Sequence, residues 1–123
     1  MADQFQSAVR WLRRNFPVAG RVYVKLAARR DIRNPDDPQE YSGHDGLCRS
    51  REKSFLILIA SDMQLGLQIV TLDHEWAHLL AFPKEADPKE FHTDKWAKAQ
   101  GKIAWQRAYG AIAAAREKRL RNP

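Results

Sequence analysis

The sequence predicts an α+β fold, and three observations lead to that prediction. Apolar residues recur at helical spacing near the N-terminus, an alternating stretch follows them, and a hairpin pattern lies near the middle of the chain. Two further helical segments occupy the C-terminal half. The 123 residues fit one domain, residues 1–123, because they can bury a modest core but not two independent ones.

The first two predicted elements are a helix over residues 3–15 and a strand over residues 21–28. In the helix, Phe5, Val9 and Leu12 recur every three or four residues with arginines between them, and Pro17 ends the helix. In the strand RVYVKLAA, apolar and polar residues alternate with the period of two that a half-buried strand needs.

A long loop and a hairpin follow. Residues 29–45 are rich in Pro, Asp and Gly, which predicts a loop. Residues 46–60 predict two strands joined by a turn at residues 51–54. The second strand, FLILIA at residues 55–60, is apolar throughout, so we expect both of its faces to be covered. The expected sheet is small and mostly antiparallel.

Two helices complete the prediction. Ser61 and Gln64 fit a capping box, and the helix that follows should run to about Ala81 because Pro83 cannot continue it. Residues 93–94, Thr-Asp, predict the start of a C-terminal helix. We expect the basic tail, about residues 116–123, to fray.

The net charge of +6 is distributed unevenly. Residues 1–30 and residues 91–123 each carry +6, whereas residues 31–90 carry −6. Basic ends of this kind can bind nucleic acid. We favour solvated helix faces, because no Arg-rich or aromatic-interleaved motif accompanies the charges. Nucleic acid binding through the terminal segments is the alternative.

Composition argues against a membrane protein and indicates a reducing compartment. The longest apolar run, residues 55–60, is far shorter than the ~20 residues that a membrane-spanning helix needs. The N-terminal segment contains Asp3 and lacks the pattern of a secretory signal. Cys48 is the only cysteine and cannot form an internal disulfide. We therefore expect a cytoplasmic protein.

The segment HEWAH at residues 74–78 carries the strongest functional signal. Residues i and i+4 of a helix lie one above the other, so His74 and His78 can bind one metal ion. Catalytic zinc takes three protein ligands and keeps a position for water. Glu75 is turned about 100° around the helix, where its carboxylate can take a proton from that water. These residues predict one Zn²⁺ per chain and hydrolysis of peptide bonds.

The third ligand comes from the segment after this helix. We favour His92, because it directly precedes a predicted helix start that would fix its backbone. Glu85 and Glu90 lie in the connection PKEADPKE and are expected to be solvated. The other carboxylate candidates are Asp87 and Asp94.

Four further residues have both a functional and a structural interpretation. His44 could approach a substrate, but a polar loop tip is the more common role. Asp73 could orient a ligand imidazole or could lie in solvent. Trp76 and Trp96 could contact substrate, but helical tryptophans of this kind more often pack in the core.

These segments resemble the SprT-like zinc metalloproteases, a family of zincins. The resemblance rests on the order of the elements, on GLC at the start of the hairpin, on LDHEWAHLL and on HTDKW. In that family a His-Gly-x-x-Phe/Trp element supplies the third ligand, and here His92 and Trp96 match it. The resemblance implies a zincin-like fold in which His74, His78 and His92 bind zinc and Glu75 is the general base.

The chain departs from the family pattern in two respects. Thr93 stands where the family has Gly, and the Cys-rich zinc ribbon with which some relatives engage DNA is missing. The resemblance is therefore to a minimal form, like the small peptidases of bacteria and their phages. It also implies that the strand at residues 55–60 lies beside the cleft, where an extended substrate could pair by strand addition.

Two rivals to a three-histidine peptidase stay open. One is a nucleic-acid-associated or assembly protein with a structural or inactive zinc site, although a structural site needs no general base such as Glu75. The other is a zincin in which Glu85 or Glu90 is the third ligand.

Overall fold

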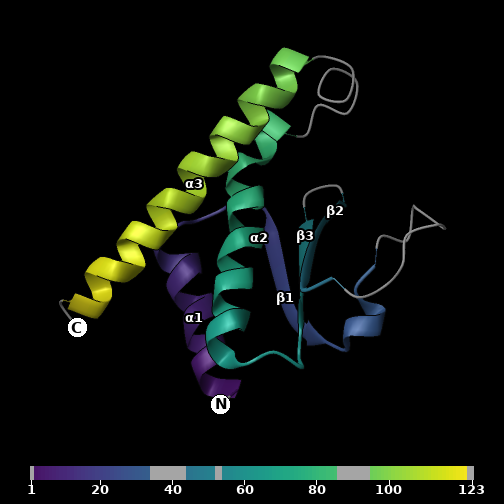
Figure 1. Ribbon diagram of the computed structural model, residues 1–123, viewed down its shortest axis with the longest axis vertical. Coiled ribbons are helices and arrows are strands. Elements are labelled where there is room, and N and C mark those ends of the chain that lie inside the picture. The colour runs from purple at the N-terminus through teal and green to yellow at the C-terminus, as the bar shows by residue number, and fades with distance from the viewer. Residues whose placement is uncertain (1, 34–43, 52–53, 86–94, 122–123) are drawn as a thin grey trace. The chain divides into compact units, whose positions relative to one another are not determined.

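The computed structural model describes residues 2–33, 44–51, 54–85 and 95–121 and has an α+β architecture (Figure 1). The chain divides into two compact units, Met1–Glu75 and Trp76–Pro123. The elements are α1 (Ala2–Asn15), β1 (Arg21–Ala27), the 3-10 helix η1 (Arg29–Asp31), β2 (Gly46–Arg51), β3 (Ser54–Ala60), α2 (Leu65–Glu85) and α3 (Lys95–Arg121).

Helix α1 confirms the predicted N-terminal helix. Its apolar residues Phe5, Val9 and Leu12 are buried, as a single apolar stripe at helical spacing requires. Arg13 and Arg14 lie in its last turn, where positive charge is favourable at the negative end of the helix dipole. The helix ends two residues before the proline, as predicted.

The sheet has three strands in the order β1-β3-β2. Strands β2 and β3 form the predicted antiparallel hairpin, but β1 pairs with β3 in parallel. The sheet is therefore mixed, and the expectation of a mostly antiparallel sheet was wrong for β1. Strand β3 is central and is hydrogen-bonded on both sides, so it has no free edge for strand addition. Strands β1 and β2 form the edges of this sheet.

The two faces of the sheet differ in burial. Phe55, Ile57 and Ile59 of β3 are buried, while Leu56 and Leu58 between them are half-buried. This alternation contradicts the expectation that both faces of the strand are covered. Because successive side chains point to opposite faces, one face of the sheet belongs to the core and the other is open.

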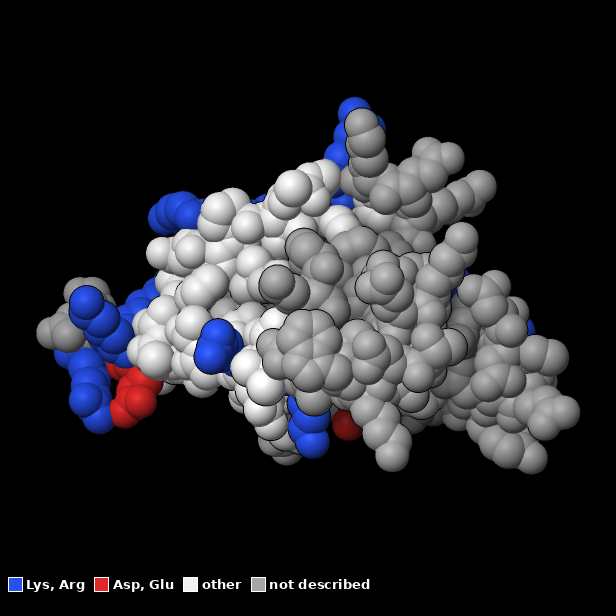
Figure 2. Space-filling model, turned by 90° about the horizontal axis from the view of Figure 1, so that it is seen from above, with Lys and Arg blue, Asp and Glu red and all other residues white. Residues whose placement is uncertain are grey.

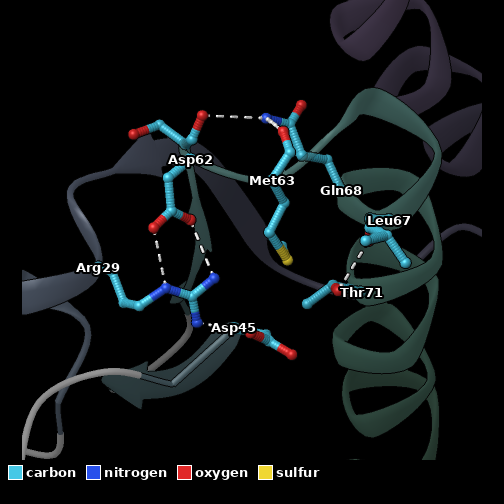
Figure 3. A network of polar contacts seen from close by, with 8 residues as sticks. Arg29, Asp45, Asp62, Met63, Leu67, Gln68 and Thr71 are labelled. Atoms are coloured by element: carbon cyan, nitrogen blue, oxygen red, sulfur yellow. Dashed lines mark hydrogen bonds and ion pairs between the residues drawn. The ribbon is translucent and has the colours of Figure 1, made fainter.

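The turn before α2 differs from the predicted capping box. Helix α2 begins at Leu65, and Ser61 lies in a turn in which its N–H donates to the carbonyl of Ala27 at 2.9 Å. The Gln68 side chain donates to the carbonyls of Met63 at 3.0 Å and of Ser61 at 3.4 Å (Figure 3). The Gln68 side chain, from the first turn of α2, therefore holds the chain segment that precedes the helix. The predicted arrangement, in which Ser61 caps the start of the helix, is not the one observed.

Arg29 joins the ends of the strands. Its Nε and Nη2 atoms donate to the two carboxylate oxygens of Asp62 at 3.0 and 2.9 Å, and Nη1 donates to Asp45 at 2.5 Å (Figure 3). A bidentate arginine–carboxylate pair of this kind fixes geometry as well as adding attraction. The hydrogen bond from Arg29 lowers the pKa of Asp62 below its ordinary value. We refer to the contacts of Arg29 with Asp45 and Asp62 as the Arg29 clamp. Nothing in the sequence pattern had indicated it.

The second unit contains the C-terminal part of α2 and helix α3. Helix α2 continues through Pro83 to Glu85, beyond the predicted end at Ala81. A proline removes one helical hydrogen bond but does not stop the chain from keeping helical dihedral angles. Helix α3 starts close to the predicted position and reaches Arg121, so the tail does not fray where we expected it to. Glu117 and Arg121 form an ion pair one turn apart, at 2.5 Å.

None of the helices in the described ranges has the length and apolar character that crossing a bilayer requires.

We predict that Arg29→Gln lowers the free energy of unfolding at neutral pH, whereas Arg30→Gln has little effect. Arg30 is an exposed arginine in the same short helix and serves as the matched control. Because the folded-state pKa of Asp62 is lowered, the contribution of the pair is fully present above the ordinary value of 3.8 and is lost as pH falls through the folded-state pKa.

Urea denaturation across this pH range provides the measurement. The stability difference between wild type and Arg29→Gln should stay constant from neutral pH to about pH 4 and shrink as the pH is lowered further. A difference that persists unchanged at the acid end would contradict the assignment of the effect to this ion pair.

Candidate metal centre

Helix α2 brings three predicted site residues together. His74, Glu75 and His78 each place a ligand atom within 4.8 Å of the others. The two histidines are separated by one helical turn, as predicted from the HEWAH spacing. The distance from His74 Nε2 to Glu75 Oε1 is 4.0 Å. The group is a local property of this one helix, so its geometry follows directly from the helical conformation of residues 65–85.

The donor set fits a zinc ion. Two imidazole nitrogens at about 2.0–2.1 Å from zinc lie at most about 4.2 Å apart. The separations within the group are no larger than 4.8 Å, so small side-chain rotations would bring the two nitrogens to that spacing. Two imidazoles with a neighbouring carboxylate form a donor set that favours zinc over calcium and magnesium, which prefer oxygen ligands.

The three side chains are buried to different degrees. The side chain of His74 is 47% exposed, whereas that of Glu75 is 10% exposed. His78 is half-buried. A ligand nitrogen at the surface can be reached by a substrate, and a carboxylate beside it lies within reach of a water molecule bound there. This gradient of burial suits a site that opens to solvent on the His74 side.

In the second unit, His78 is held by aromatic side chains of α3. Its ring lies 5.5 Å from the ring of Trp105, with 32° between the planes. Trp105 in turn stacks on Tyr109 at 5.2 Å and 11°. This tilted ring contact restricts rotation of the imidazole. The sequence pattern gave no indication that these two aromatic residues lie beside His78.

In the first unit, Glu75 lies against the start of β2. A Cβ atom placed on Gly46 would lie 2.6 Å from Thr71 Cγ2 and 3.3 Å from Glu75 Cγ. Thr71 cannot turn away freely, because its hydroxyl donates to the Leu67 carbonyl at 2.8 Å (Figure 3). Glycine is therefore required at position 46 for α2 to approach the strand. The GLC sequence marked this glycine, but not the reason for it.

The remaining candidate residues differ in their burial and in whether the structure describes them. Asp73 is 5% exposed, which contradicts its solvent-exposed interpretation. Trp76 is 1% exposed, which confirms its packing role. His44 is exposed and is not a member of the metal-binding group. Glu85 and Trp96 lie in described helices, but their side chains are outside the described part of the structure. The remaining third-ligand candidates, Asp87, Glu90, His92 and Asp94, lie outside the described residues.

No protein-family model, characterised protein or solved structure matches this chain. The likeness to SprT-like zincins therefore rests on the residues quoted above and stays a prediction.

We predict that Gly46→Ala destabilises the protein by about 1–3 kcal/mol, the usual cost of overpacking. Replacing a strand glycine by alanine is ordinarily favourable by about 0.5–1 kcal/mol, so the contact with Thr71 reverses the expected sign. Thr71→Ser removes Cγ2, the nearest atom, and keeps the hydroxyl that bonds to Leu67. The double variant Gly46→Ala/Thr71→Ser should recover most of the lost stability.

Denaturant titrations of the four proteins form a double-mutant cycle. Gly66→Ala is the control, because no atom lies within 4 Å of a Cβ placed there. Additive effects of the Gly46 and Thr71 substitutions would show that the close approach does not limit the packing of α2 on β2.

Proposed function

We propose that the protein is a zinc-dependent peptidase that hydrolyses peptide bonds of protein substrates. The observation that supports this proposal is the gathering of His74, Glu75 and His78 on one helix, with a carboxylate beside two imidazoles. A site that uses zinc only for structure has no need of Glu75. Zinc, when bound, lowers the pKa of a bound water and polarises the substrate carbonyl.

Each residue of the group has a distinct role in this proposal. His74 and His78 hold the metal through ring nitrogens, and Trp105 keeps the His78 ring in place. Glu75 accepts a proton from the attacking water at a carboxylate oxygen and later delivers it to the leaving amine nitrogen. The packing of Glu75 Cγ near Gly46 limits the positions that this carboxylate can take.

The substrate is proposed to bind as an extended strand along β2. Within the described part of the chain, strand β2 pairs with β3 on one side only, and its first residue, Gly46, lies close to Glu75. An extended peptide that adds to this edge would pass the carboxylate with its backbone hydrogen-bonded to the sheet. Strand β2 therefore takes the role that the sequence had assigned to residues 55–60.

We predict that Glu75→Gln abolishes hydrolysis and keeps the metal. Loss of the general base should lower the rate by about 10²–10⁴-fold, whereas His74→Ala and His78→Ala should lose the zinc itself. Metal content is measured by mass spectrometry on protein purified without a His-tag. Hydrolysis is measured on a peptide library derived from denatured proteins. Glu117→Gln, the same change on the exposed face of α3, is the control.

The outcomes separate the alternatives. Zinc in wild type and in Glu75→Gln, with cleavage only in wild type, supports the peptidase. Zinc without any Glu75-dependent cleavage favours a structural site in a nucleic-acid-associated or assembly protein. A wild-type protein that binds no zinc when zinc is supplied would overturn the proposal.

The third ligand is proposed to be His92. We predict that His92→Ala loses zinc, as His74→Ala does, whereas Glu85→Ala and Glu90→Ala retain it. Added zinc should raise the melting temperature of every variant that still binds it, since a ligand that binds the folded state stabilises it by ~2.7 kcal/mol at 100 times its Kd. Zinc loss in Glu85→Ala or Glu90→Ala, with retention in His92→Ala, would establish the carboxylate version of the site.

A further inference from the structure

Basic side chains that are far apart in the sequence lie together on the open face of the sheet. The three strands contain no Asp or Glu. The register aligns Tyr23 with Leu56 and Leu56 with Arg49, so these three residues share a face. Arg21 and Lys25 lie two residues before and after Tyr23 and therefore project from the same face.

This face is opposite to the one that packs in the core. Gly46 and Ile59, which are aligned with each other, belong to the face against α2. On the other face Tyr23 is 49% exposed, and Arg21, Lys25 and Arg49 are exposed. Leu47, Leu56 and Leu58 are half-buried and form the floor between them.

Among the described residues, no carboxylate neutralises the cations on this face. No ion pair joins Arg21, Lys25 or Arg49 to another side chain in the parts of the chain that the structure describes. Figure 2, which shows the molecule from above, has more Lys and Arg surface than Asp and Glu surface among the described residues on that side. The charge on the sheet therefore acts on partners from outside.

We propose that the open face of the sheet binds single-stranded nucleic acid. An exposed aromatic ring on a sheet offers a stacking platform for a base, and arginine or lysine beside it attracts the phosphates. Arg21 and Lys25 lie about 7 Å along the strand from Tyr23, on either side of it. Arg49 lies about 10 Å across the sheet, two strand spacings away. Bases stack on Tyr23, and the backbone of the nucleic acid follows the cations.

The observations favour this partner over an acidic peptide or an anionic membrane. Carboxylates or lipid headgroups would use the cations but would gain nothing specific from a tyrosine between two of them. A duplex presents its bases stacked inside and cannot use the ring. The proposal does not rest on the peptidase, because none of these residues belongs to the metal-binding group.

The test is fluorescence anisotropy of the full chain with a labelled 12-nucleotide oligo(dT), in EDTA, at several salt concentrations. Tyr23→Ala should weaken binding by about tenfold or more, from the loss of one stacked base. Tyr23→Phe should bind like wild type, because the ring is kept. Arg49→Gln should reduce the slope of log K against log salt by about 0.7, the value for one phosphate contact on a single strand.

The control is Arg13→Gln, which removes one exposed charge from α1. It should leave the slope unchanged. Wild type that does not bind, Tyr23→Ala that binds as wild type does, or Arg13→Gln that changes the slope as much as Arg49→Gln would each overturn the proposal. Tyr23-dependent binding of polyglutamate or phosphatidylserine vesicles, with no binding of oligo(dT), would assign the surface to another partner and would also overturn it.

Discussion

The close approach of β2 to α2 at Gly46 is the contact on which the arrangement of the candidate site depends. A methyl group at this position would meet Thr71 at 2.6 Å, so the distance between strand and helix is set by the absence of a side chain. The same glycine lies near the Glu75 side chain. The edge of the sheet and the carboxylate are thereby brought together in the first unit. Under the proposed peptidase function, an extended substrate bound at this edge would pass close to the Glu75 carboxylate.

The Arg29 clamp supports this contact from outside. Asp45, which directly precedes Gly46, and Asp62, in the turn before α2, both bind the same guanidinium (Figure 3). The N–H of Ala60 also donates to the Asp45 carbonyl at 2.8 Å. The start of β2 and the entry to α2 are therefore tied to one side chain. A single exposed ion pair adds modest stability in general, so the clamp contributes to stability mainly by fixing where these two segments begin.

The helices and strands that the sequence predicted correctly are those whose apolar residues follow a single helical or strand period. The stripe of Phe5, Val9 and Leu12 and the alternation at residues 21–28 depend only on local geometry, and α1 and β1 agree with them. The spacing of His74 and His78 was equally local. Two of the failures depend on distant partners, namely the parallel pairing of β1 and the burial of alternate residues in β3. The third, the replacement of a Ser61 cap by Gln68, depends on a local side-chain contact that the capping pattern does not describe. Periodicity identifies a strand but does not specify which strand pairs with it.

The mixed sheet also explains why charge counted along the chain was misleading. Arg21 and Lys25 belong to the basic segment at residues 1–30, and Arg49 belongs to the acidic segment at residues 31–90, yet the register places all three on one face. In a strand, each residue is separated from its sequence neighbours by the sheet itself. Residues 46–49 therefore alternate between two environments, with Gly46 against α2 and Arg49 in solvent. A substitution on one face of β2 need not disturb the other, so the contact at Glu75 and the cationic surface can differ independently in proteins that share this sheet.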